Sequence, residues 1–256
     1  MHKSIIGTKT MVVSPHYLAS MAGRTILQKG GNAFDAAVAV SACLAVVYPH
    51  MTGLGGDSFW LMYSASDRAI RAYNGSGRSG YEVHSGIYAG EPAIPFRGVK
   101  SAITVPGMVD SWHTILKEYG LLSFAEVLDP AISYAINGFP FTKDQYENTV
   151  KNIDVLSEMP ITSDIYTPNR SIPRIGERFV QTELAQSLRY IALAGRDGFY
   201  KGELARTMVS YLKQNGGLLT LDDFADPKGT GRLRYQRHTG IIRCIKFRQI
   251  RKASSA

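Results

Sequence analysis

The residues best suited to ligand chemistry lie in a glycine-rich stretch that begins at Asn74 and ends at Gly80. Near its middle, Arg78 carries a planar guanidinium group that can make a two-pronged contact with a carboxylate. Asn74 is a weaker candidate for a polar contact from the same stretch. The alternative interpretation of Arg78 is an exposed arginine without a partner, and the residues alone leave both interpretations open.

Other patterns that would indicate chemistry lack the required context. Gly53-Leu54-Gly55-Gly56 follows a predicted helix and precedes a predicted strand, which reverses the order found in a dinucleotide-binding motif. Gly75-Ser76-Gly77 lacks the spacing of a nucleophile elbow. Cys43 is predicted to be an inert core residue. The histidines show no metal-ligand spacing, so we predict neither a metal site nor a bound cofactor.

These residues are positioned by elements arranged around an apolar helix at Ala36–Val47. Gly30 and Gly31 are predicted to end the preceding helix, because glycine adopts the left-handed backbone that a C-terminal cap requires. Asn32 and Asp35 have the spacing of a capping box for the apolar helix. A helix that is apolar on every side is a buried one, and this helix is shorter than the roughly 20 residues that cross a membrane.

The remaining pattern mixes strands and helices, with helices dominating after Val105, and therefore indicates the α+β class. The strands Ser58–Tyr63 and Ala69–Tyr73 are predicted to pair as a hairpin. Further short strands are predicted at residues 11–14 and 98–104. Helices are predicted at residues 16–29, 108–119, 142–166 (with a break at Met159-Pro160), 182–194 and 201–215, with two pieces separated at Asp129-Pro130 and a last short helix starting at Thr220.

The net charge of +8 comes from one end of the chain. Eight of the 29 basic residues lie in residues 229–256, which contain no Asp or Glu, so the other 21 balance the 21 acidic residues. This abrupt change suggests three hypotheses: a frameshift or premature stop in the gene, an inert solvated tail, or a phosphate-binding arm. We therefore separate a region of residues 1–228 from a basic tail of residues 229–256.

A series of motifs resembles the gamma-glutamyltransferase (gamma-glutamyltranspeptidase) family in order along the chain. The series covers roughly Met11 to Asp226, the N-terminal large-subunit region of the family. The motifs are Gly-Gly-Asn-Ala-x-Asp-Ala-Ala from Gly30, Pro-His-x-x-Gly-x-Gly-Gly from Pro49, Val-Pro-Gly from Val105, Gly-Phe-Pro from Gly138, Gly-Phe-Tyr-Lys-Gly from Gly198 and Asn-Gly-Gly-Leu-Leu-Thr from Asn215. Members of this family are self-processing N-terminal-nucleophile hydrolases.

The resemblance implies the large-subunit part of a four-layer αββα sandwich shared with a small subunit. The family nucleophile is a threonine at the start of the small subunit, where its freed amino group acts as the base. The family reaction transfers or hydrolyses gamma-glutamyl amides such as glutathione. Because no Thr of this chain matches that setting, we assign no catalytic residue. The chain alone is expected to be inactive and, without a small subunit, poorly soluble.

The resemblance also implies a substrate contact after the second hairpin strand, where the family has an arginine that holds the alpha-carboxylate of the glutamyl group. This chain reads Tyr73-Asn74-Gly75-Ser76-Gly77-Arg78-Ser79 there, and its arginine comes a few residues later. The difference favours a divergent, acylase-like branch with other amide substrates. Arg78 and Asn74 are the predicted substrate-binding residues.

A different class of function also fits the residues. A non-catalytic binding protein could use the basic tail to contact nucleic acid or a partner subunit, although a neutral body argues against nucleic acid. The N-terminus from Met1 to Thr8 has no apolar core of signal-peptide length, so we expect a cytoplasmic protein without a membrane anchor.

Overall fold

The computed structural model describes residues 6–66, 68–225, 237–239 and 242–244. The chain divides into two compact units. The first unit contains residues 1–54 and 112–198, and the second contains residues 55–111 and 199–256. Helices α3 (Met108–Tyr119) and α8 (Thr182–Tyr200) each pass from one range to the other.

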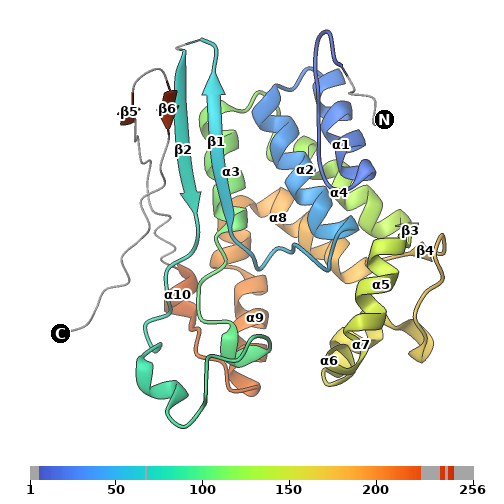
Figure 1. Cartoon of the computed structure of the whole chain (residues 1–256), viewed down its shortest axis with the longest axis vertical. Coiled ribbons are helices and arrows are strands. Elements are labelled where there is room, and N and C mark those ends of the chain that lie inside the picture. The colour runs from blue at the N-terminus through green and yellow to red at the C-terminus, as the bar shows by residue number, and fades with distance from the viewer. Residues whose placement is uncertain (1–5, 67, 226–236, 240–241, 245–256) are drawn as a thin grey trace. The chain divides into compact units, whose positions relative to one another are not determined.

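Three helices of the first unit lie side by side: α1 (Tyr17–Gln28), α2 (Ala33–Val47) and α4 (Phe124–Asn137) (Figure 1). The predicted capping box of α2 is confirmed, because the Asn32 side chain accepts hydrogen bonds from the N–H groups of Phe34 and Asp35. Most of the apolar side chains of α2 are buried, as the sequence predicts, although Ala33 and Ala37 are exposed. Gly30 adopts a φ of 92° just after α1 and ends that helix as expected.

Asp35 connects α2 to the segment between α3 and α4. Its fully buried carboxylate accepts hydrogen bonds from the N–H groups of Asn32, Leu121 and Leu122. The Asn32 side chain donates to the Tyr119 carbonyl oxygen at 2.6 Å. One residue pair therefore caps α2 and also holds a segment more than 80 positions away in the sequence.

The predicted interruption at Pro130 is wrong, since α4 runs through it without a break. Proline has no N–H group and costs a helix interior about 3 kcal/mol. Leu128, Ala131 and Ala135 of α4 are completely buried, and α4 packs against α2. We attribute the continuity of α4 to this packing, which offsets the missing hydrogen bond.

Apart from its parts of α3 and α8, the rest of the first unit consists of short helices and one small sheet. The predicted helical stretch at residues 142–166 forms three helices, because the expected break at Met159-Pro160 is joined by a second break at Asn152. No strand forms at the described residues 11–14. Residues 142–166 are mostly polar, so they offer too little apolar surface to hold one long helix. The bounds are α5 (Lys143–Lys151), α6 (Ile153–Ser157), α7 (Pro160–Tyr166), η3 (Pro168–Arg170), β3 (Phe139–Pro140) and β4 (Arg178–Phe179).

The second unit contains the predicted hairpin, formed by β1 (Ser58–Ser64) and β2 (Ala69–Gly75) (Figure 1). Its antiparallel register places Phe59 opposite Asn74 and Tyr63 opposite Ile70. The predicted strand at residues 98–104 is wrong, because residues 99–101 form a 3-10 turn and only Thr104 makes a bridge, to Ser79. The other elements are η1 (Ser85–Tyr88), η2 (Val99–Ser101), α9 (Glu203–Gln214) and α10 (Leu221–Ala225).

Most of the predicted basic tail lies outside the described residues. Within it, β5 (Arg237–Thr239) pairs with β6 (Ile242–Cys244) in antiparallel register. The boundary at residue 228 therefore stays a prediction. In the described part of the chain, every helix is too short or too polar to cross a membrane.

Candidate functional site

The predicted substrate loop begins at the end of β2 and is held by the backbone of two other segments. The carbonyl oxygen of Gly56 accepts hydrogen bonds from the N–H groups of Gly107 and Met108, at 3.1 and 3.0 Å. The Arg78 carbonyl oxygen accepts one from Val105 N–H at 2.9 Å. We call this meeting of residues 55–57, 75–80 and 103–108 the glycine junction.

Glycine is required at this junction because the three backbones touch directly. A Cβ atom on Gly77 would overlap the carbonyl oxygen of Val105, and one on Gly107 would overlap that of Gly75. A Cβ atom on Gly75 would approach the Ser58 carbonyl oxygen to 2.7 Å. The glycines therefore allow a packed main chain from which a few polar side chains project.

A buried network supports the junction at the start of α3. The Tyr73 hydroxyl donates to Asp110 Oδ2 at 3.2 Å. The Tyr200 hydroxyl accepts from Asp110 N–H at 3.0 Å and donates to the Pro106 carbonyl oxygen at 2.7 Å. Because these groups are buried and hydrogen-bonded, they fix the backbone on both sides of Gly107.

Asn74, the first predicted site residue, is buried at the end of β2. Its side-chain oxygen accepts a hydrogen bond from Ser76 N–H at 3.0 Å. This is the local turn that asparagine commonly stabilises with its own backbone two positions on. Asn74 therefore shapes the loop, whatever further contact it makes with a ligand.

Arg78, the second predicted site residue, forms an ion pair with Asp223. Arg78 Nη1 donates to Asp223 Oδ1 at 2.9 Å and to the Ser79 carbonyl oxygen at 2.9 Å. Arg78 Nη2 donates to the Asp223 carbonyl oxygen at 3.3 Å. The guanidinium also lies 3.7 Å from the ring centroid of Tyr81, within cation–π range. The alternative of an unpartnered arginine is therefore wrong, and contact with a substrate stays a prediction.

Asp223 is a site residue that the sequence analysis missed. Burial tends to raise the pKa of its carboxyl group, but hydrogen bonds from Thr220, Tyr81 and Arg78 outweigh burial and lower that pKa. The spacing of Thr220 and Asp223 predicts a helix start, which α10 confirms. Nothing in that spacing predicts a partner 145 residues away.

Asp57 is a second carboxylate that the sequence analysis missed. It directly precedes β1, and its Oδ1 atom accepts a hydrogen bond from Gly77 N–H at 3.2 Å. The residue as a whole is exposed, but its carboxyl group is partly buried, and this burial raises the pKa of that group. Hydrogen bonds from the Gly77 and Gly107 backbone lower the pKa, but by less than burial raises it. The junction thus presents an acceptor carboxylate beside the loop of Asn74 and Arg78.

The junction offers contacts for a polar ligand. A carboxylate or amide oxygen of a ligand suits the guanidinium of Arg78, and an ammonium or amide N–H suits Asp57. In the part of the chain that the structure describes, no three or more His, Cys, Asp or Glu residues gather in a way that could hold a metal ion. The predicted inert character of Cys43 agrees with its complete burial in α2, which raises the pKa of its thiol.

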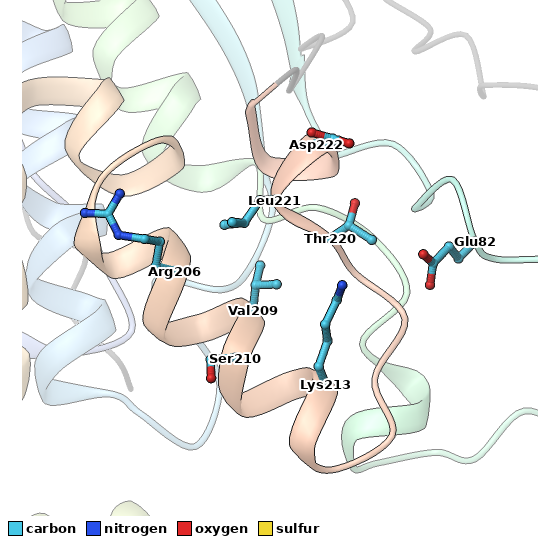
Figure 2. Close-up of a pocket in the computed structure, with 8 residues that line it drawn as sticks. All are labelled: Glu82, Arg206, Val209, Ser210, Lys213, Thr220, Leu221 and Asp222. Carbon is cyan, nitrogen blue, oxygen red and sulfur yellow. The ribbon is translucent and has the colours of Figure 1, made fainter.

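A surface cavity of about 440 Å³ lies beside α9 and α10 in the same unit (Figure 2). Lys213 extends from α9 toward Thr220, and Glu82 stands on the opposite side. Their charged groups are exposed, and Arg206 at the other end is paired with Glu203 at 2.8 Å. Exposed charges of this kind are well solvated, so the cavity is a weaker candidate for a site than the glycine junction.

The sequence of this chain is similar to one family of known proteins. The sequence model of a family described as gamma-glutamyltranspeptidase matches residues 19–232. The chain is 63% identical over 229 residues to the glutathione hydrolase-like YwrD proenzyme of Bacillus subtilis, covering 90% of this chain and 44% of that protein. It is 40% identical over 228 residues to the oxamate amidohydrolase proenzyme of Klebsiella pneumoniae, covering 87% and 43%.

The fold of this chain is similar to the solved structures of a gamma-glutamyltranspeptidase and of an acylase. Helicobacter pylori gamma-glutamyltranspeptidase matches with a TM-score of 0.90 and 28% identity, covering 96% of this chain and 72% of that one. Cephalosporin acylase from Bacillus halodurans matches with a TM-score of 0.75 and 34% identity, covering 81% and 40%. The chain spans less than half the length of the two curated relatives.

Proposed function

The chain belongs to the gamma-glutamyltranspeptidase family, and from this premise we propose that it forms the large-subunit part of an amide-cleaving enzyme. The predicted family is thereby confirmed. The solved relatives also confirm the predicted fold class, the α+β large-subunit part of an N-terminal-nucleophile hydrolase. Enzymes of this family act as two-subunit heterodimers.

The observation that carries the proposal is the apolar face of the β1–β2 hairpin. Phe59, Leu61 and Tyr63 alternate along β1 on one face and are 62%, 64% and 59% exposed. Among the described residues, β1 pairs only with β2. Three large apolar side chains on one strand form a surface that soluble proteins usually cover. We propose that the small subunit covers it and brings the nucleophilic threonine to the glycine junction.

In this arrangement the threonine attacks the amide carbonyl carbon, forms an acyl-enzyme and releases the amine. Water or an acceptor amine then attacks the ester and restores the threonine hydroxyl. Asn74 and Arg78 are proposed to contact the acyl group from the large-subunit side, and Asp57 is proposed to accept a hydrogen bond from a substrate N–H or ammonium group. Without the small subunit this chain is proposed to be inactive.

The substrate is proposed to be a gamma-glutamyl amide or a related acyl amide. The names of the relatives describe a glutathione hydrolase-like protein, an oxamate amidohydrolase and an acylase, which all point to amide cleavage. Because the loop of this chain departs from the family arginine motif, we propose that glutathione is not its preferred substrate.

The test is co-production of the 256-residue chain with a threonine-initiated small subunit from a family member. Hydrolysis of a gamma-glutamyl anilide or of an acyl amide by the pair, and by neither chain alone, would support the proposal. The matched control is a small subunit whose first threonine is replaced by alanine, which should give no turnover.

The other outcome favours the non-catalytic alternative. A pair that forms no complex and shows no turnover, together with steeply salt-dependent DNA binding that disappears on deletion of residues 229–256, would identify a binding protein instead.

A further inference from the structure

The carboxylate of Asp223 uses its two oxygen atoms for two different parts of the chain. Its Oδ2 atom accepts hydrogen bonds from Thr220 N–H and the Thr220 hydroxyl, both at 2.8 Å. Its Oδ1 atom accepts hydrogen bonds from Tyr81 N–H at 2.8 Å and from Arg78 Nη1 at 2.9 Å. One oxygen thus caps α10, and the other holds the end of the substrate loop.

The position of Arg78 is consequently set from outside its own loop. Its guanidinium contacts both the carboxylate and the backbone carbonyl of Asp223. The Asp223 side chain is 0% exposed and that of Arg78 is 22% exposed, so solvent screens this pair much less than a surface pair. Removing one member would leave the other charge poorly compensated.

The loop is held along its backbone by the glycine junction, whereas the Arg78 side chain and the Tyr81 N–H group at its end are held by Asp223. Between Asn74 and Gly80 it contains three glycines, which lose more conformational freedom on ordering than other residues. The cavity of about 440 Å³ is lined by Glu82 and Asp222, the sequence neighbours of Tyr81 and Asp223 (Figure 2). The hydrogen bonds of Asp223 join the end of the loop to the start of α10.

We propose that Asp223 is a positioning residue that orders the loop Asn74–Gly80 by holding Arg78 and Tyr81. The loop then presents Asn74 and Arg78 in one fixed arrangement, at a lower entropy cost when a substrate binds. The catalytic consequence rests on the proposed function, whereas the ordering of the loop is a property of this chain alone.

The first test measures hydrogen exchange in the 256-residue chain. In Asp223→Asn and in Arg78→Gln, the amide of Tyr81 and the peptides covering residues 76–81 should exchange at least about tenfold faster than in the unsubstituted chain. Arg206→Gln is the matched control, because it removes an exposed arginine–glutamate pair of the same unit. Unchanged exchange of residues 76–81 in both loop variants would overturn the proposal.

Two variants are needed because Asp223→Asn could also unfold α10. Arg78→Gln leaves the hydrogen bonds between Thr220 and Asp223 in place, so it tests the loop without removing the cap. Circular dichroism identifies any loss of helix. If Asp223→Asn loses helical signal, the exchange rates of Arg78→Gln alone decide the proposal.

The second test uses the chain combined with a threonine-initiated small subunit. Asp223→Asn should raise KM for the amide substrate roughly tenfold, the effect of losing a hydrogen bond to a charged group, and should change kcat much less. Arg206→Gln should leave both constants unchanged. An unchanged KM in an active Asp223→Asn pair would overturn the positioning role. If no pair is active, the proposed function fails, and hydrogen exchange still decides whether Asp223 orders the loop.

Discussion

The backbone carbonyl of Val105 lies so close to Gly77 that a Cβ atom added to Gly77 would overlap its oxygen. Neither Val105 nor Gly77 can move easily, because both are hydrogen-bonded. Val105 N–H donates to the Arg78 carbonyl oxygen, and Gly77 N–H donates to the Asp57 carboxylate. The shape of the glycine junction therefore depends on the absence of a side chain at one position.

We expect Gly77→Ala to lower the free energy of unfolding by about 3 kcal/mol, since an inserted methyl group in a packed site forces the backbone to shift. Gly55→Ala is the control, because in the described part of the chain a Cβ atom there has no neighbour within 4 Å, so its cost should stay within about 0.5 kcal/mol. Urea unfolding followed by circular dichroism measures both. Equal midpoints for the two variants would contradict the packing of the junction.

The exposed face of β1 leads to a prediction about association. Leu61→Lys places a charge in the middle of that face, so the isolated chain should become more soluble and bind less of a dye that recognises apolar surface. The same substitution should prevent co-purification with a small subunit. Leu193→Lys is a matched control, because Leu193 on α8 is 86% exposed and lies outside the hairpin. Similar effects of both substitutions would argue against a specific interface on β1.

The thiol of Cys43 should be unreactive in the folded chain. Cys43 lies on α2 and is completely buried, and this burial raises the pKa of its thiol. Almost no thiolate therefore forms at neutral pH, and reagents cannot reach the sulfur atom. In a Cys244→Ser variant, whose one remaining cysteine is Cys43, a disulfide reagent should react only after denaturant is added. Rapid reaction under native conditions would mean that α2 opens locally.

Local signals in the sequence predict the starts of α2 and α4 well. Asn32 with Asp35 and Ser123 with Glu126 both form the reciprocal capping contacts that their spacing indicates. The hairpin and helix α3 also follow from patterns within a few residues. These features depend on neighbours in the chain, and their physical causes are therefore visible in a short window of sequence.

Features that depend on distant partners are not predictable in this way. The continuity of α4 through Pro130 results from packing against α2, and propensity at Pro130 alone predicts the opposite. The pairing of Arg78 with Asp223 joins positions 145 residues apart, so the sequence identifies the arginine but not what holds it. The family resemblance indicates which loop matters, and only the structure shows how that loop is fixed.

Two histidines of the first unit are poorly suited to protonation. His16 caps the start of α1, where its Nδ1 atom accepts a hydrogen bond from Leu18 N–H at 3.3 Å. Its Nε2 atom and the Nδ1 atom of His50 are buried and find no hydrogen-bond partner among the described residues. Burial lowers the pKa of both residues, Asp144 opposes this shift, and His50 adds to the lowering at His16.

The stability of the chain should therefore fall in mild acid. The folded state disfavours protonated His16 and His50, so their pKa values are lower in the folded chain than the value of about 6.5 in the unfolded chain. The stability that their neutral forms contribute is fully present above the unfolded pKa. It is lost as the pH falls through the pKa values of the folded chain. Urea midpoints should decrease between about pH 7.5 and 5.5. His16→Asn keeps a capping side chain that does not titrate, so its midpoint should change less with pH. The control is His84→Asn, because His84 is exposed. If the urea midpoint of His16→Asn falls with pH as steeply as that of His84→Asn, His16 is not responsible for the loss of stability.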